Sequence, residues 1–215
     1  MTIQWTVEQD IGHLRLNQPP ANTMTMKFFG ELKALMERIA KTENLRAIVV
    51  SGNGRHYSSG ADIKELLLHA EEHSMIENYQ TFLMLERLKI PVISAIRGVC
   101  LGSALELALA CHFRICSEEA VFGLPESTFN LMPGIGGIQR FASIAGKANA
   151  IEYTLRGSTF SATAAFEMGL VDAVVPKAEI LPFSLKFAAL LPVNFQQSER
   201  ALYLHKFLTP MHASG

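Results

Sequence analysis

Two spacings of hydrophobic residues alternate along the chain. Alternating or β-branched apolar runs, which are typical of strands, recur early, at residues 3–7, 11–16, 47–51 and 92–96. Between them, residues 25–40 carry apolar side chains at the three- and four-residue spacing of an amphipathic helix. The pattern predicts a surface helix packed over a sheet, and Thr25 is placed to cap it.

The same alternation continues through the middle of the chain. Residues 63–88 are predicted to form a broken helix with a polar middle at 69–74, and residues 99–111 form a short, almost wholly apolar helical segment. Further strands and glycine-punctuated helices are expected at 114–117, 120–122, 137–144, 148–155, 162–168 and 170–175. Strands that alternate with helices indicate the α/β class.

The end of the chain has a different pattern. After Pro176, helical stretches at 178–190 and 195–208 are separated at Pro192, and no strand is predicted there. We therefore expect an α/β core over 1–176 followed by a helical tail over 177–215.

Composition narrows the class of protein. The chain has 215 residues, 49% hydrophobic and 18% charged, which predicts one large folded domain. Its 19 Lys and Arg against 20 Asp and Glu leave no net field to attract nucleic acid. No apolar run reaches the roughly 18 residues needed to span a membrane, and the first residues do not follow a signal-peptide pattern. We therefore expect a soluble, cytoplasmic protein.

The three cysteines show neither paired spacing nor nearby histidines that would indicate a metal site. Cys100, Cys111 and Cys116 all lie in apolar surroundings and lack the CxxC spacing. We expect them to be reduced and buried, as free cysteines usually are. The alternative for Cys100, which lies near a helix start, is a nucleophile with a lowered pKa.

A first candidate for chemistry is the glycine-rich segment at 51–62, which follows a strand and runs into a helix. Such a loop can leave backbone N–H groups free to bind a phosphate or a developing oxyanion, although a plain glycine turn is the alternative. It lacks the GxGxxG and GK[ST] spacings of nucleotide sites. His56 is expected in a solvent-exposed turn rather than as a base, and Asp62 is placed to cap the helix.

A second candidate is Glu106, which lies three residues after Ser103 on the same face of an apolar helix. It has no cationic partner within that helix, and a buried carboxylate without a partner is costly. We expect a catalytic or ligand-binding role; the alternatives are a structural glutamate whose hydrogen bonds are satisfied elsewhere, and an exposed helix face.

A third candidate is Glu126, which follows a predicted strand on a turn stiffened by Pro125. Its side chain can project over the sheet. The glycines at 132–140 form another helix entrance, for which a tight helix start with close packing is the favoured interpretation.

Together these segments resemble the crotonase (enoyl-CoA hydratase/isomerase) superfamily from about residue 3 to residue 176. Its landmarks appear in the family's order as SGNGRHYSSGADI (51–63), KIPVISAIRGVCLGSALELALAC (89–111), AVFGLPE (120–126), PGIGGIQR (133–140) and MGLVDAVVP (168–176). The resemblance implies a spiral of ββα turns with a short C-terminal helical tail, assembled as a homotrimer or a dimer of trimers.

The resemblance also implies a role in fatty acid metabolism, with an acyl-CoA thioester as the substrate. Coenzyme A is then part of that substrate, and no metal, redox cofactor, nucleic acid or membrane is implied. By position, the backbone N–H groups of Ala61 and Ser103 correspond to the oxyanion hole, and Glu106 and Glu126 to the catalytic pair. The remaining substrate-binding positions that it implies are Ser59, Gly60, Asp62, Ile63, Gly102, Pro133 and Gly134.

Two glutamates favour hydration of an α,β double bond, with one carboxylate taking a proton from water while the other donates at the α-carbon. The alternatives are a double-bond isomerase that relies on Glu126, and a non-catalytic relative that binds acyl-CoA. The chain departs from the family at Ser103 and Ala104, where glycines are usual, at His112 for Asp, and at Tyr57 for Phe. Its helical end is also shorter than is usual for the family, so the CoA contacts made there cannot be assigned.

Overall fold

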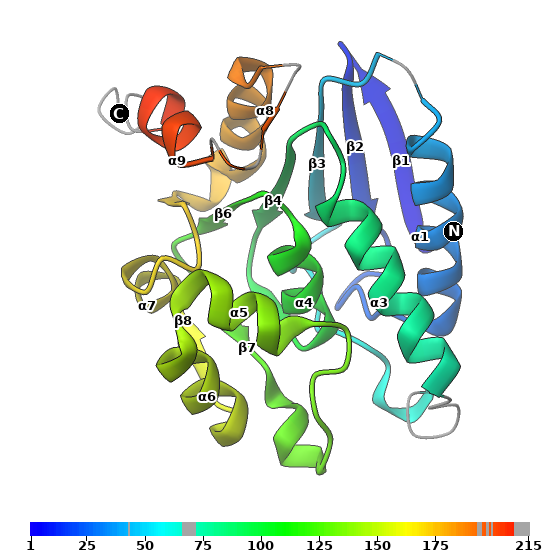
Figure 1. Ribbon diagram of the computed structural model, residues 1–215, viewed down its shortest axis with the longest axis vertical. Helices are drawn as coiled ribbons and strands as arrows, with labels where there is room; N and C mark the ends of the chain where they lie inside the picture. The colour runs from blue at the N-terminus through cyan, green and yellow to red at the C-terminus, as the bar shows by residue number, and fades with distance from the viewer. Residues whose placement is uncertain (43, 66–71, 193–194, 197, 199, 209–215) are drawn as a thin grey trace.

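The computed structural model describes residues 1–42, 44–65, 72–192, 195–196, 198 and 200–208. A six-stranded sheet runs through the molecule in the order β1-β2-β3-β4-β6-β9 (Figure 1). Its first pair is antiparallel, with Ile3 opposite Leu16, and every other pair is parallel. The strands are β1 (Ile3–Glu8), β2 (Ile11–Leu16), β3 (Ala47–Gly52), β4 (Val92–Ile96), β6 (Phe113–Ser117) and β9 (Ala173–Val175).

A second, three-stranded sheet carries the turns that build the site. It consists of β5 (Val99–Leu101), β7 (Val121–Gly123) and β8 (Thr159–Ser161), with β5 parallel to β7 and β8 antiparallel to it. The prediction of one helix over 99–111 was therefore wrong at its start, because residues 99–101 pair with β7. Gly102, at φ +53°, separates this strand from helix α4 (Ser103–Ala110). The sequence pattern also did not predict β8.

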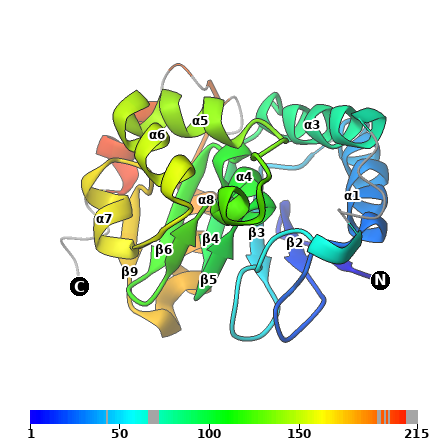
Figure 2. The same cartoon turned by 90° about the horizontal axis from the view of Figure 1, so that it is seen from below.

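Helices cover both faces of the large sheet. On one side α1 (Met26–Ile39), α3 (Glu72–Glu86) and α4 enclose the larger apolar cluster, and on the other α8 (Ile180–Leu190) encloses the smaller one (Figure 2). The predicted helix over 25–40 is confirmed, and its Thr25 hydroxyl accepts a hydrogen bond from the Phe28 amide at 3.4 Å. β4 and β6 are buried at every position, as expected for parallel strands with helices on both faces.

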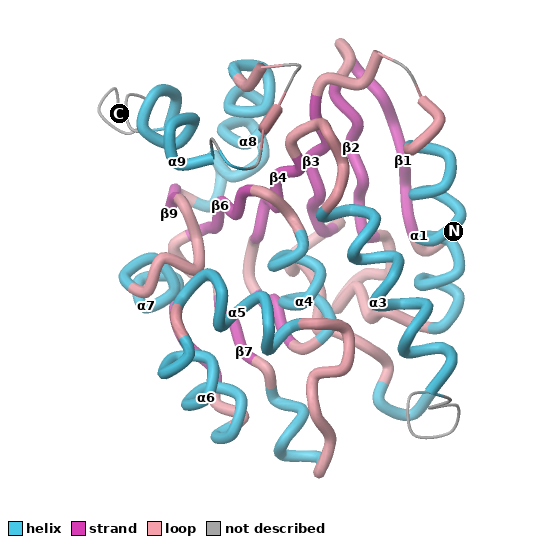
Figure 3. Tube along the Cα trace, in the orientation of Figure 1, coloured by secondary structure: helices cyan, strands magenta, loops and turns pink. Residues whose placement is uncertain are grey.

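Helices of the second half pack around the smaller sheet (Figure 3). They are α5 (Gly137–Ala145), α6 (Lys147–Arg156) and α7 (Ala162–Glu167), with one-turn 3₁₀ helices η1 (Pro125–Phe129) and η2 (Lys177–Glu179). The tail contains α8, α9 (Arg200–Tyr203) and the π-helical turn η4 (Leu204–Leu208). The strand expected at 170–175 is confined to β9. Of the polar middle predicted at 69–74, residues 69–71 lie outside the described residues, and residues 72–74 belong to α3.

The expected α/β class is thus present, while the division into a core over 1–176 and a tail over 177–215 stays a prediction. Among the described residues, no helix combines the length and the apolar character that crossing a membrane would need.

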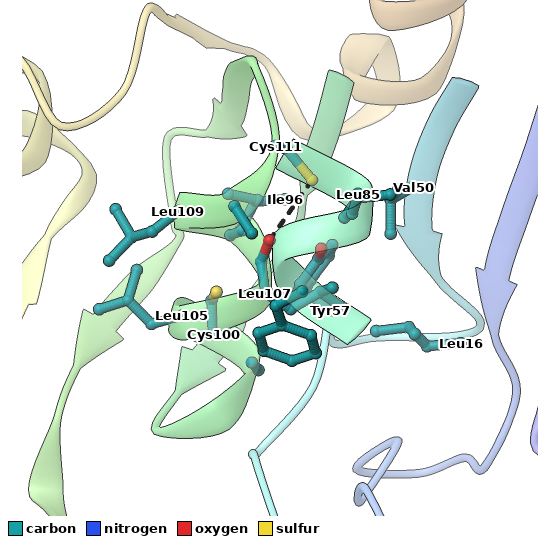
Figure 4. Packing of buried hydrophobic residues seen from close by; sticks show 14 of the residues in the cluster. Leu16, Val50, Tyr57, Leu85, Ile96, Cys100, Leu105, Leu107, Leu109 and Cys111 are labelled. Atoms are coloured by element: carbon teal, nitrogen blue, oxygen red, sulfur yellow. Dashed lines mark hydrogen bonds between the residues drawn. The ribbon is translucent and has the colours of Figure 1, made fainter. Parts of the chain in front are cut away.

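All three cysteines are free and buried, as the sequence predicts. Figure 4 shows Cys100 and Cys111 close to buried leucines of α4, and the Cys111 thiol donates to the Leu107 carbonyl at 3.4 Å. Burial raises the pKa of the Cys100 thiol well above its ordinary value. A nucleophile needs the thiolate, so the alternative reading of Cys100 as a reactive nucleophile was wrong.

Candidate active site

The glycine-rich loop after β3 lies directly against the start of α4. The Ser58 amide donates to the Val99 carbonyl at 3.0 Å, and the Leu101 amide donates to the Ser58 carbonyl at 3.2 Å. A Cβ atom on Gly60 would lie 2.5 Å from the Leu101 oxygen and 3.4 Å from the Ser103 nitrogen, and Gly60 has φ +91°. Only glycine allows this approach, which brings residues 60 and 61 beside the first residue of the helix.

Two backbone N–H groups at this junction lack acceptors. The Met24 amide donates to the Gly60 carbonyl and the Asp62 amide donates to the Met24 carbonyl, so the Ala61 amide between them faces the other way. Ser103 is the first residue of α4, where an amide has no partner within the helix. Within the described part of the chain neither amide donates a hydrogen bond to protein. The helix dipole adds partial positive charge at the same place.

Glu106 lies one turn into α4 and is 1% exposed. Its Oε1 atom accepts hydrogen bonds from the amides of Ile135 and Gly137, each at 2.9 Å. Burial raises the pKa of Glu106, while the two amide hydrogen bonds and the charge of Arg140 act in the opposite direction. The interpretation of Glu106 as part of an exposed helix face was therefore wrong, and the carboxyl group is held in a fixed orientation.

Glu126 lies in η1, just beyond β7, as Pro125 predicts. Its Oε2 atom is buried and has no hydrogen-bond partner among the described residues. Burial, with a smaller contribution from the charge of Glu106, raises the pKa of Glu126 to about 7. A Cβ on Gly102 would lie 3.0 Å from Glu126 Oε1, and the Gly102 carbonyl accepts from the Glu106 amide at 3.0 Å. Glu126 therefore reaches the turn of α4 from which Glu106 projects.

The other expected substrate-binding residues of the first loop lie on its rim. Ser59 is exposed, and its hydroxyl is 3.4 Å from that of Thr23. Ile63 is 37% exposed. Asp62 caps its helix as predicted, since its Oδ1 accepts from the amides of residues 64 and 65. The substrate contacts of these residues stay predictions.

Two further expectations concern Gly134 and His56. Pro133 is buried, and a Cβ on Gly134 would overlap the methyl group of Met75 in α3, so this glycine allows close packing. His56 is partly buried rather than fully exposed, and its Nδ1 accepts from the Val99 amide at 3.2 Å. Burial and nearby cations lower the pKa of His56, which makes it a neutral acceptor that holds the strand.

Sequence reasoning missed the groups that hold Glu106. The amides of Ile135 and Gly137 come from the glycine-rich entrance of α5, which the sequence indicated only as a tight helix start. Arg140, in the same helix, binds the Ile135 carbonyl at 2.7 Å and the carboxylate of Glu86 at 2.9 Å. A main-chain donor has no signature of its own in a sequence, although the cluster of glycines next to an arginine was visible.

Known proteins are similar to this chain over most of its length. The family model described as enoyl-CoA hydratase/isomerase matches residues 6–204. A Bacillus subtilis protein named "Probable enoyl-CoA hydratase" is 35% identical over 215 residues, covering 95% of this chain and 83% of that protein. The fatty acid oxidation complex subunit alpha of Shewanella amazonensis is 38% identical over 174 residues, which are 78% of this chain and 25% of that subunit.

The solved structures agree with the sequence matches. The crystal structure of an enoyl-CoA hydratase from Bacillus anthracis superposes with a TM-score of 0.83 at 34% identity, covering 88% of this chain and 76% of that one. With a family model spanning nearly all of its residues, this chain belongs to the enoyl-CoA hydratase/isomerase family of the crotonase superfamily.

Proposed function

We propose that the chain adds water across the α,β double bond of an enoyl-CoA thioester. The observation that carries this proposal is that Glu126 reaches the turn of α4 that bears Glu106, close to the Ala61 and Ser103 amides, which donate to no acceptor among the described residues. Hydration needs a base for water, an acid for the α-carbon, and donors for the charge on the thioester oxygen. These main-chain and side-chain groups supply all three.

The environments of the two glutamates differ in a way that assigns their roles. Glu106 accepts two backbone N–H hydrogen bonds on one oxygen, which favours its ionised form. Glu126 has a buried oxygen with no donor among the described residues and a pKa raised to about 7, which favours its protonated form. Glu106 is then the base that removes a proton from water as its oxygen attacks the β-carbon, and Glu126 donates a proton to the α-carbon.

The amides of Ala61 and Ser103 act on the thioester oxygen. Attack at the β-carbon moves negative charge onto that oxygen as an enolate. Two preorganised donors and the start of α4 stabilise this charge more strongly than they stabilise the neutral carbonyl. Loss of one such donor typically costs about 3–4 kcal/mol of barrier.

Isotopic labelling tests the proposal directly. The protein is incubated with short, long and aromatic 2-enoyl-CoA thioesters in ¹⁸O-labelled and deuterated water, and loss of the conjugated absorbance is followed. We expect ¹⁸O at the β-carbon and deuterium at the α-carbon of a 3-hydroxyacyl product. Glu106→Gln and Glu126→Gln should each lower kcat by at least about 100-fold. Recovery of unlabelled substrate from every thioester would refute the proposal.

The second candidate is a double-bond isomerase, favoured by the pKa of Glu126 near 7, which suits a single group that both takes and returns a proton. In that reaction Glu106 has no role in proton transfer. One variant therefore distinguishes the two functions. Glu106→Gln should abolish hydration but leave isomerisation of a 3-enoyl-CoA intact.

A further inference from the structure

We propose that Arg140, held by Glu86, is a positioning residue that fixes the carboxylate of Glu106 for catalysis. The inference rests on the proposed two-glutamate hydration and adds to it a residue with no contact to the reacting atoms. It follows from one short chain of contacts, which runs from α3 through the guanidinium group and the backbone of a single residue, Ile135, to Glu106.

The inner end of this chain of contacts is the backbone of Ile135. Arg140 Nη1 donates to the Ile135 carbonyl at 2.7 Å, and the Ile135 amide donates to Glu106 Oε1 at 2.9 Å. The guanidinium group therefore holds the same residue that holds the carboxylate. Any movement of residues 135–137 moves both N–H donors to Glu106 at once.

The turn at Gly136 makes this contact possible. Gly136 has φ +87°, a conformation that side chains other than glycine rarely adopt, and a Cβ there would overlap Arg140 Nη1. The arginine side chain thus folds back over the turn that precedes its own helix. It occupies space that the glycine leaves open.

The outer end of the chain fixes the guanidinium itself. Glu86 Oε2 accepts from Arg140 Nε at 3.0 Å and lies 2.9 Å from Nη2. The Tyr79 ring of α3 lies 5.6 Å from the guanidinium carbon. Arg140 is 7% exposed, whereas the Glu86 side chain is 31% exposed, so the guanidinium is the buried end of this ion pair. A planar guanidinium group with several donors can contact Glu86, Tyr79 and the Ile135 carbonyl at the same time, whereas the single ammonium group of lysine cannot.

Arg140 acts on Glu106 through its charge as well as through its contact with Ile135. The guanidinium lies close enough to lower the pKa of Glu106 against the effect of burial. Removal of the charge should therefore make Glu106 harder to ionise and shift the acidic limb of the rate profile to higher pH. A residue that only ties α5 to α3 would affect stability without this shift.

The test compares Arg140→Met and Arg140→Lys with Arg156→Met, which removes an exposed arginine that pairs with Glu152 within its own helix. On an enoyl-CoA thioester that the wild type hydrates, we expect kcat to fall by about 10–100-fold in Arg140→Met while KM changes less than about threefold. The acidic limb should move to higher pH in Arg140→Met and less in Arg140→Lys. Arg156→Met should match the wild type.

Chemical rescue adds a readout that a structural role does not predict. Arg140 and Glu86 border a cavity of about 300 Å³ that also touches His112 and Ser143. Guanidinium ion at millimolar concentration should enter the space left in Arg140→Met and raise kcat, and it should do nothing for Arg156→Met. If Arg140→Met does not fold, Glu86→Gln carries the test, with a smaller loss of kcat expected.

The outcomes separate the inference from the proposed function. A wild type that hydrates no thioester overturns both. The positioning role alone is overturned by a different result. In that case the wild type needs both glutamates for hydration, but the wild-type kcat and pH profile are kept by Arg140→Lys, Glu86→Gln and any folded Arg140→Met.

Discussion

Replacement of Gly137 by alanine tests whether the orientation of Glu106 controls the rate. The Cβ of an alanine here would lie 2.5 Å from Glu106 Cγ and 2.8 Å from Oε1. Because non-bonded carbons normally approach to about 3.5–4.0 Å, the glutamate side chain has to shift by about 1 Å. That shift removes at least one of its two amide hydrogen bonds. We expect kcat to fall by about 100-fold, since a displacement of about 1 Å can cost this much.

The same substitution should cost about 1–3 kcal/mol of unfolding free energy, as overpacking of a core does. Gly30→Ala is the matched control, because Gly30 is exposed within α1 and no atom lies within 4 Å of its added Cβ. The control should keep kcat and gain about 0.5–1 kcal/mol from helix propensity.

Kinetics on a 2-enoyl-CoA thioester measure the fall in kcat, and denaturant unfolding measures the loss of unfolding free energy. A folded Gly137→Ala variant with kcat within twofold of the wild type would refute the reasoning, because the carboxylate would then tolerate the displacement.

Three further predictions concern the two catalytic steps and acid stability. The wild-type kcat/KM should be bell-shaped in pH, with a basic limb near 7 where Glu126 loses its proton; a rate unchanged through the acidic range would contradict the role of ionised Glu106 as base. Ser103→Gly should keep kcat within about threefold, whereas Ser103→Pro, which replaces the amide proton and the hydroxyl with a ring at a helix start that tolerates proline, should lower kcat by about 100–1000-fold; equal rates in the two variants would exclude this amide from the oxyanion hole. Burial lowers the pKa of His112 from 6.5 to about 4, so the stability it contributes is present above pH 6.5 and is lost as pH falls through 4. The loss is about 3 kcal/mol, and His112→Gln should flatten the plot of unfolding free energy against pH in that window; an unchanged slope would contradict this.

Local patterns determined most of the secondary structure. The helix at 25–40 and its Thr25 cap, the strands before residue 100, and the turn at Pro125 depend on spacing and on conformational limits that act within a few residues. Glu106 was also visible as a candidate, because a carboxylate within an apolar helix is costly wherever that helix packs. The roles of the Ala61 and Ser103 amides came from the family resemblance, since main-chain groups are the same in every residue.

Only the tertiary structure decided what surrounds the two glutamates. Residues 99–101 could continue a helix or form a strand, and pairing with β7, about 20 residues later, made them a strand. The donors to Glu106 come from 29 and 31 residues further along the chain. The raised pKa of Glu126 depends on burial by segments distant in sequence. Burial and hydrogen bonding are properties of the folded surroundings, so the identity of a residue and its near neighbours does not determine them.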